Sequence, residues 1–375
     1  MKIVVNAISA RRGGIVTYTE NLIEGLAARN VDAVVAVPPE LAQTHPRGAM
    51  AVDTAGYSPL RRVLWEQSVW RRRVTRESPD VVFSSANFGL LWSPAPQVLL
   101  VREGGLFDPF YLTNVAPSQG SVRAVERAIR RRLILLSARR ADRVIMPSRA
   151  MRDWLLLWAP EIAHKCSVNP YGTVPAFRAD DAPPRPWRAD GMLRLLYVSV
   201  YYPHKNPAVI CQAAGALNAD GIDTRARITM EPQEFDLSGG RYDWLMVRQA
   251  VEAGQAMLGH VDYRDLPALY RSHDVFVFPS VSETFGHPMA EALSSGLPIV
   301  AADTSINREI CGDAALYFPP FRPTALVDCL KRLDAEPALR DRLRTEAKRI
   351  SERFYRWDDH VDRLIETFGS LARGK

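Results

Sequence analysis

The sequence predicts an α/β fold made of two doubly wound, Rossmann-like domains. Its 375 residues exceed the needs of one small core and suit two domains of ordinary size. Short, nearly continuous apolar runs alternate with helical patterns, which is typical of parallel sheets covered on both faces. A stretch rich in Pro, Asp and Arg at 176–192, "AFRADDAPPRPWRADGM", has no apolar periodicity and separates two such series.

The first series begins with the apolar run "KIVVNA". Its expected strands are 2–7, 32–38, 80–85, 97–102, 143–148 and 165–172, and its expected helices are about 14–29, 60–77, 119–140 and 149–158. The second series begins with "LRLLYVSV". Its expected strands are 193–200, 225–230, 256–261, 274–280, 297–303 and 315–320, and its expected helices are 206–219, 241–254, 265–273, one from about 288, one at 323–334 and the closing helices. Open sheets of this kind bind ligands beyond the carboxyl ends of their strands, so we expect a ligand cleft between the two domains.

The charge is unevenly distributed along the chain. Residues 1–180 carry a net charge of +9 and the remainder −3, within a total of +6. The excess lies in 61–77 and 121–143, where Arg alternates with apolar residues in helical patterns. An ordinary solvated helix face and an anionic membrane surface are both open interpretations. Neither a helix-turn-helix pattern nor basic strands with interleaved aromatic residues is present, so we expect no nucleic-acid partner.

The sequence also bears on the compartment. The four cysteines have no metal-ligand spacing, which favours a reduced, cytoplasmic protein. The N-terminal apolar run is too short for a signal peptide, and no run of about 18 uncharged apolar residues predicts a transmembrane helix. A peripheral position on the inner face of the plasma membrane is the hypothesis that the basic helices add.

Two loops that follow strands could bind phosphate. In "SARRGGIVTYTENL" (9–22), Gly13 and Gly14 allow a tight turn before a helix whose N-terminal amides attract anions. An ordinary strand-to-helix turn is the alternative there. In "SVYYPHKNP" (199–207), Lys205 lies near a helix start, where the helix dipole disfavours a cation unless an anion is bound. A surface lysine is the alternative for this loop.

A third loop, in "PSVSETFGHPMAEALSSGLPIVAAD" (279–303), carries two acids. Pro288 suits the first turn of a helix, which places Glu283 on the loop and Glu291 on the helix. The backbone amides of Phe285, Gly286 and His287 would then lie at the helix entry. Carboxylates accept paired hydrogen bonds from neighbouring sugar hydroxyls, although a first-turn acid and a surface acid are the plain alternative.

The spacing of Glu283 and Glu291 resembles the E-x7-E signature of the retaining GT-B glycosyltransferases of family GT4. "GHVDYRDLPALYRSHDVFVFPS" before it, "GGIVTYTENLIEGL" near the N-terminus, and "HKN" at 204–206 are similar to other parts of that family, and the first of these matches is the most specific. "FYRWDDHVDRLIETFGSL" resembles the family's terminal helix, which crosses back to the N-terminal domain. The resemblance implies an acceptor-side domain at 1–178, a donor-side domain at 190–353 and a crossing helix at 354–375.

The resemblance also implies a metal-independent transfer from a nucleotide sugar, GDP-, UDP- or dTDP-linked, to a hydroxyl of a glycan or lipid-linked acceptor, with retention at the anomeric carbon. Bacterial surface polysaccharide or glycolipid synthesis is the setting it suggests. Glu291 would hold the ribose, and Glu283 would hold the donor sugar together with the amides of residues 285–287. Lys205 and the Gly13–Gly14 amides would neutralise the diphosphate.

Two positions depart from the family pattern. Val200 stands where an Arg usually precedes the lysine by five residues, and His204 is a candidate to compensate. Arg102 and Glu103 replace a His-Asp pair whose His contacts the sugar, which leaves the donor sugar open. Both are candidates for sugar or acceptor contact, or for a structural ion pair. A GT-B epimerase or phosphorylase and a non-catalytic sugar-nucleotide-binding scaffold remain alternatives.

Overall fold

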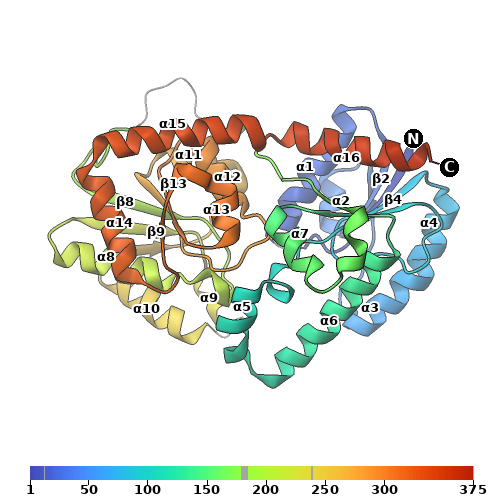
Figure 1. The fold of residues 1–375 in the computed structure, drawn as a ribbon, viewed down its shortest axis with the longest axis horizontal. Coiled ribbons are helices and arrows are strands. Elements are labelled where there is room, and N and C mark those ends of the chain that lie inside the picture. Colours follow the sequence, from blue (N-terminus) through green and yellow to red (C-terminus); the bar gives the residue numbers. More distant parts are fainter. Residues whose placement is uncertain (12, 179–184, 238–239, 375) are drawn as a thin grey trace. The chain divides into compact units, whose positions relative to one another are not determined.

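The computed structural model describes residues 1–11, 13–178, 185–237 and 240–374, and it divides into two compact units. Unit 1 comprises Met1–Pro109, Pro117–Pro170 and Asp358–Lys375, and unit 2 comprises Phe110–Ala116 and Tyr171–Trp357. The predicted linker at 176–192 lies partly outside the described residues. Both chain ends belong to unit 1 (Figure 1).

Unit 1 is built on a seven-stranded parallel sheet with the order β3-β2-β1-β4-β5-β6-β7. Its strands are β1 (Lys2–Asn6), β2 (Asp32–Val37), β3 (Ala49–Ala51), β4 (Val81–Ser84), β5 (Gln97–Leu100), β6 (Arg143–Met146) and β7 (Cys166–Val168). Its helices are α1 (Gly14–Ala28), α2 (Pro39–Thr44), α3 (Pro59–Trp65), α4 (Arg71–Glu77), α6 (Gly120–Arg140), α7 (Arg149–Leu156) and α16 (Trp357–Ala372). All four residues of β4 and of β5 are buried, because helices cover both faces of a parallel sheet.

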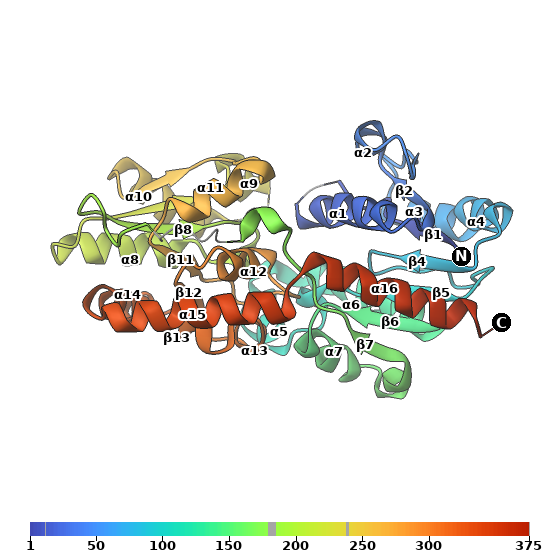
Figure 2. The same cartoon turned by 90° about the horizontal axis from the view of Figure 1, so that it is seen from above.

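Unit 2 is built on a six-stranded parallel sheet with the order β10-β9-β8-β11-β12-β13. Its strands are β8 (Leu193–Tyr197), β9 (Thr224–Ile228), β10 (Ala256–Leu258), β11 (Val275–Phe278), β12 (Ile299–Ala302) and β13 (Ala315–Phe318). Its helices are α5 (Pro109–Asn114), α8 (Ala208–Ala219), α9 (Pro232–Leu237), α10 (Arg241–Glu252), α11 (Leu266–Arg271), α12 (His287–Ser294), α13 (Ser305–Cys311), α14 (Pro323–Ala335) and α15 (Pro337–Phe354). Figure 2 shows β8, β11, β12 and β13 following one another across this sheet.

Each sheet reverses its strand order once, between β1 and β4 in unit 1 and between β8 and β11 in unit 2. Such a switch point leaves a crevice beyond the carboxyl ends of the two central strands, since their connections leave toward opposite faces. The loop after β1 ends at Gly13, and Gly14 begins α1. The loops after β8 and β11 carry Lys205 and Glu283. The prediction of two doubly wound α/β domains is confirmed.

Several element boundaries differ from the prediction for local reasons. The expected helix 60–77 contains a π-helical turn, Glu66–Trp70, between α3 and α4. The helix expected from 206 begins at Ala208 because Asn206 is left-handed, with φ 48°. The short elements β3, α2, α5, α9 and α13 were not predicted. Within the described residues, no helix has the length and apolar character that crossing a membrane would require.

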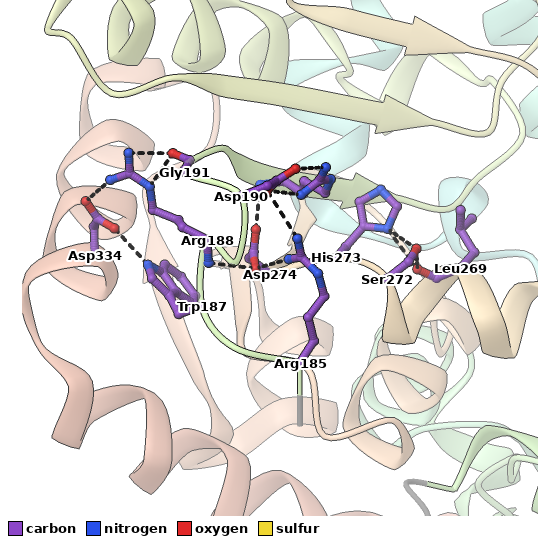
Figure 3. A network of polar contacts seen from close by, with 11 residues as sticks. Arg185, Trp187, Arg188, Asp190, Gly191, Leu269, Ser272, His273, Asp274 and Asp334 are labelled. Atoms are coloured by element: carbon purple, nitrogen blue, oxygen red, sulfur yellow. Dashed lines mark hydrogen bonds and ion pairs between the residues drawn. The ribbon is translucent and has the colours of Figure 1, made fainter. Parts of the chain in front are cut away.

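The end of the linker is fastened to unit 2 by two carboxylates, Asp274 and Asp334 (Figure 3). The side chain of Asp274, at the start of β11, is 1% exposed. It accepts hydrogen bonds from Arg185 Nη1 (2.6 Å) and from the backbone amides of Arg188 (3.2 Å) and Arg194 (2.8 Å). Asp334 accepts from Trp187 Nε1 (2.7 Å) and Arg188 Nη1 (2.9 Å). This network holds the amino ends of β8 and β11, at the edge of the sheet opposite Lys205 and Glu283.

Candidate functional site

Lys205 and Glu283 form an ion pair across the switch point of unit 2. Lys205 Nζ lies 2.5 Å from Glu283 Oε1, and each side chain is 12% exposed. The Lys205 carbonyl accepts a hydrogen bond from the Tyr197 hydroxyl at 2.9 Å, which ties the loop back to its own strand, β8. The Val281 amide donates to the His204 carbonyl at 2.9 Å, which joins the two loops. The structure therefore brings together two residues that lie 78 positions apart in the sequence.

The electrostatics of this pair favour its charged form. Burial raises the pKa of Glu283, but the Lys205 ammonium, the His204 ring and hydrogen bonds outweigh burial, and the pKa lies below its usual value. Burial, followed by the charge of Lys205, lowers the pKa of His204 to about 3. The His204 ring is therefore neutral at pH 7, and the lysine supplies the positive charge of this loop.

Two buried polar atoms flank the ion pair. Within the described residues, Asn206 Nδ2 and Ser282 Oγ have no hydrogen-bond partner. Buried polar groups are nearly always bonded, so unsatisfied ones next to a buried ion pair are typical of a place for a bound molecule or water.

Gly286 forms the turn that leads into α12. Its φ is 79°, a left-handed conformation that favours glycine, and a Cβ there would lie 2.6 Å from Met289 Cε, so that the methionine side chain would also have to shift. Phe285 is 1% exposed, and its ring packs against those of Tyr171 and Tyr355, with centroids 5.2 and 5.4 Å away. The His287 ring stacks on Tyr171 at 4.8 Å. Because both rings are packed inside unit 2, the turn can offer a ligand its backbone rather than these side chains.

Glu291 lies on α12 and is 5% exposed. The Tyr270 hydroxyl lies 2.9 Å from its Oε2 and 3.1 Å from the Pro288 carbonyl oxygen. Burial raises the pKa of Glu291 to about 7, although the Tyr270 hydrogen bond partly opposes this shift. A ligand that donates hydrogen bonds to this carboxyl would stabilise its charged form and lower its pKa.

The raised pKa of Glu291 predicts how stability changes with pH. The folded value of about 7 exceeds the ordinary 4.5, so this group stabilises the fold fully below pH 4.5, and the contribution is lost as the pH rises through 7. Between pH 4.5 and 8, the wild type should lose about 3 kcal/mol more unfolding free energy than Glu291→Gln, which cannot ionise. Urea denaturation of both proteins across this range measures the difference. If the unfolding free energies of the wild type and of Glu291→Gln changed equally with pH, the raised pKa of Glu291 would be contradicted.

Two residues that support the site were not predicted from the sequence. Tyr270 holds Glu291. Asn307, on α13, donates from Nδ2 to the carbonyls of Ser280 (3.2 Å) and Ala302 (2.8 Å), joining the ends of β11 and β12. Tyr270 lies in "GHVDYRDLPALYRSHDVFVFPS", the family-like string that precedes the two acids, whereas no sequence pattern marks Asn307.

In unit 1, the glycine loop follows β1 at the switch point. Gly13 caps α1 with φ 69°, which favours glycine, and Gly14 is the first residue of the helix. Ser9 Oγ accepts a hydrogen bond from Arg62 Nη2 at 2.8 Å, and Arg62 Nε lies 3.0 Å from Glu66 Oε1. Arg62 and Glu66 therefore support this loop, although their helix was interpreted only as a basic surface.

Arg102 and Glu103 follow β5 in unit 1. The Arg102 guanidinium lies 5.2 Å from the centre of the Tyr18 ring. Glu103 accepts hydrogen bonds from Asn87 (3.2 Å) and from Arg130 on α6 (3.0 Å). The structure thus gives Glu103 an ion-pair role with Arg130 and places Arg102 against an aromatic ring.

Metal ligands were not expected. Within the part of the chain that the structure describes, no group of three or more His, Cys, Asp or Glu side chains is placed to hold a metal ion.

Two family profiles match the chain one after the other. The profile described as Glycosyltransferase Family 4 matches residues 12–175, and the one described as Glycosyl transferases group 1 matches residues 186–350. The second match contains Lys205, Glu283 and Glu291.

Curated relatives match over shorter stretches. O-antigen chain mannosyltransferase B of Escherichia coli is 35% identical over 126 residues, 33% of this chain and 32% of that protein. D-inositol 3-phosphate glycosyltransferase of Thermomonospora curvata is 38% identical over 101 residues, 26% of this chain and 23% of that protein. The chain thus aligns with about a quarter to a third of the length of these relatives.

Solved structures match over the whole chain at low identity, so they bear on the fold alone. Sucrose-phosphate synthase from Thermosynechococcus elongatus has a TM-score of 0.78 with 16% identity, covering 100% of both chains. Anabaena HepE in complex with UDP and glucose has a TM-score of 0.74 with 16% identity, covering 99% of this chain and 100% of that one. WaaG, a glycosyltransferase involved in lipopolysaccharide biosynthesis, has a TM-score of 0.72 with 14% identity and covers 98% of this chain and 99% of that one.

Proposed function

Because the chain belongs to glycosyltransferase family 4 and has the GT-B fold, we propose that it transfers a sugar from a nucleotide-diphosphate sugar to a hydroxyl acceptor. The observation that carries this proposal is the largely buried Lys205–Glu283 pair at the switch point of unit 2, whose side chains are each 12% exposed. A cation and an acid held side by side there match the two parts of such a donor, its diphosphate and its sugar.

In the proposed donor complex, Lys205 binds the diphosphate, and Glu283 turns from Lys205 to the hydroxyls of the sugar. The turn at 285–287 offers backbone amides to the same sugar, and Glu291 accepts hydrogen bonds from the ribose hydroxyls. Gly13 and Gly14 are candidate phosphate ligands of unit 1. His204 positions its neighbour Lys205, while Arg102 and Glu103 remain candidates for sugar or acceptor contact.

The proposed chemistry separates an anionic diphosphate from an oxocarbenium-like sugar. A fixed cation and amides aimed at the leaving oxygens lower this barrier, because they meet charge that develops in the transition state. We propose that Lys205 supplies this charge without a metal ion. We further propose retention by a front-face route, in which the departing phosphate oxygen accepts the proton of the attacking hydroxyl.

The identities of the donor and of the acceptor are proposed from the relatives. Several curated relatives are mannosyltransferases, two of them O-antigen chain mannosyltransferases, so a mannosyl donor is the first to test, with GDP-, UDP- and dTDP-linked sugars as the panel. A glycan or lipid-linked acceptor in bacterial surface polysaccharide or glycolipid synthesis fits the same relatives.

A panel of nucleotide sugars separates this proposal from its rivals. The matching donor should raise the melting temperature, and free nucleoside diphosphate should accumulate when an acceptor is added. Product formation without an acceptor would favour an epimerase. Binding without turnover under any acceptor would favour a non-catalytic scaffold. No thermal shift with any nucleotide sugar would contradict the proposed site.

We also propose that the N-terminal half of α6 contacts an anionic membrane surface. Val122, Val125 and Ile129 lie on one side of the helix and are 72%, 59% and 53% exposed. Arg123 and Arg132 are exposed on the same helix. Exposed apolar side chains between arginines fit the headgroup region of anionic lipids. Such contact would place the protein peripherally on the inner face of the plasma membrane.

Replacing Arg123 and Arg132 with serine should weaken binding to phosphatidylglycerol-containing liposomes by about ten-fold or more, since each cation near such a surface contributes about 1 kcal/mol. Arg131 is a poorer choice, because it packs on Trp158 with its guanidinium 3.6 Å from the ring centre. Arg342→Ser with Lys348→Ser is the matched control on unit 2. Liposome co-sedimentation measures the binding of the wild type, the Arg123/Arg132 variant and the control. If the Arg123/Arg132 variant bound as strongly as the wild type, the membrane proposal would be contradicted.

A further inference from the structure

A short segment from the first half of the sequence packs on the donor loops of unit 2. Residues Phe110–Ala116 belong to unit 2. Tyr111, Val115 and Ala116 form a cluster with Val281, which is 1% exposed. Val281 is the residue whose amide bonds to His204, so this segment covers the junction of the loops that carry Lys205 and Glu283.

Around this junction lie five aromatic rings, which we call the aromatic wall: Phe110, Tyr111, Tyr202, His204 and Phe321. Tyr202 stacks on His204 with centroids 5.8 Å apart and planes 8° apart, and Tyr111 meets His204 edge-on at 5.9 Å. Phe110 stacks on Phe321 at 6.3 Å and 15°. Tyr202 is 47% exposed and Phe321 is 45% exposed. The wall thus offers two partly open rings that inner rings hold in place.

The backbone of Phe321 is strained. Its φ of 62° is left-handed, a conformation that is rare and strained for a bulky residue. The residue lies between β13 and α14, on the same edge of the sheet as Lys205 and Glu283. A strained, exposed phenylalanine at a ligand-binding edge is typical of a residue kept for contact.

We propose that the aromatic wall is a subsite for a sugar ring of the acceptor glycan, an inference that rests on the proposed transfer. A pyranose has an apolar C–H face, which packs on an aromatic ring, and a rim of hydroxyls. The rings of the wall carry no charge at neutral pH, because burial keeps His204 in its neutral form. An uncharged sugar suits them better than a diphosphate, which Lys205 attracts. The wall thus seats the acceptor sugar beside the donor site.

Two variants test the subsite without disturbing the fold. Tyr202→Ala removes an exposed ring. Phe321→Gly removes the other and also suits the positive φ, so it should fold at least as well as the wild type. Tyr242→Ala, on α10, is the control, because this tyrosine is exposed elsewhere on unit 2.

Binding is measured on an array of two- to six-residue oligosaccharides of mannose, glucose, galactose, N-acetylglucosamine and rhamnose, with hits titrated by calorimetry. Both variants should bind the best wild-type hit at least ten-fold more weakly, and the control should bind it normally. UDP and GDP should shift the melting temperature of all proteins equally.

The remaining outcomes overturn the subsite. Unchanged oligosaccharide binding in both variants would show that the rings of Tyr202 and Phe321 do not bind the sugar. Loss of nucleotide binding in Tyr202→Ala would assign that ring to the nucleotide instead. Normal nucleotide binding with no oligosaccharide bound by the wild type would exclude the subsite but leave the proposed donor site intact. The absence of both kinds of binding would remove the proposed function itself.

Discussion

Replacing Lys205 with alanine is expected to reduce transfer by about 10²- to 10³-fold, the usual loss when one preorganised group that stabilises developing charge is removed. The lysine is the partly buried cation of the loop after β8, and the neighbouring His204 is neutral at pH 7, so it cannot replace the lost charge. Initial rates with the donor identified by the nucleotide-sugar panel measure this effect. Lys331→Ala, which removes an exposed lysine of unit 2, should retain normal rates.

The Lys205 variant also leaves Glu283 buried without its partner, which destabilises a protein because the desolvated charge is uncompensated. The double variant Lys205→Met with Glu283→Gln removes both charges and should recover the melting temperature without recovering activity. This pattern separates the loss of a charged ligand from a loss of folding. Normal transfer by Lys205→Ala at unchanged stability would contradict the assignment of the donor site.

Strands with strong local signals could be predicted from the sequence. The run "DVFVF" yields β11, which is buried on both faces and therefore apolar at every position. Short elements such as β3, with only three residues, have too little pattern to be recognised, and their existence depends on pairing with β2. The π-helical turn in the predicted helix 60–77 has no local signal either.

The acids and the lysine of the candidate site were proposed from the sequence because Lys205 and Glu283 each follow a strand, Glu291 lies on the next helix, and all three stand in family-like motifs. Their pairing could not, since the contact between Lys205 and Glu283 depends on β8 and β11 lying next to each other in the sheet. The aromatic wall was not predicted for a similar reason. Phe110 and Phe321 lie 211 positions apart, and only the packing of 110–116 on unit 2 brings their rings together.

Replacing Asp274 with asparagine should destabilise unit 2 more than any other single change in its linker network. Asp274 is almost fully buried and receives three hydrogen bonds, two of them from backbone amides of the linker and of β8. An asparagine has only one acceptor oxygen, so if that oxygen keeps the bonds from Arg185 and Arg188, its NH2 group faces the Arg194 amide, and Arg185 loses the buried negative charge that pairs with it. Breaking such a pair costs about 3–5 kcal/mol.

For a unit of this size, a loss of that order should lower the melting temperature by roughly 10 °C. Asp190→Asn is the matched control, because Asp190 pairs with Arg185 and Arg194 in the same network, but its side chain is 47% exposed. Solvent screens such exposed pairs, so this control should melt close to the wild type. Scanning calorimetry of the three proteins gives the comparison. Equal shifts for both variants would mean that the buried carboxylate does not hold the linker, whereas a large shift for Asp274→Asn alone would assign that role to Asp274.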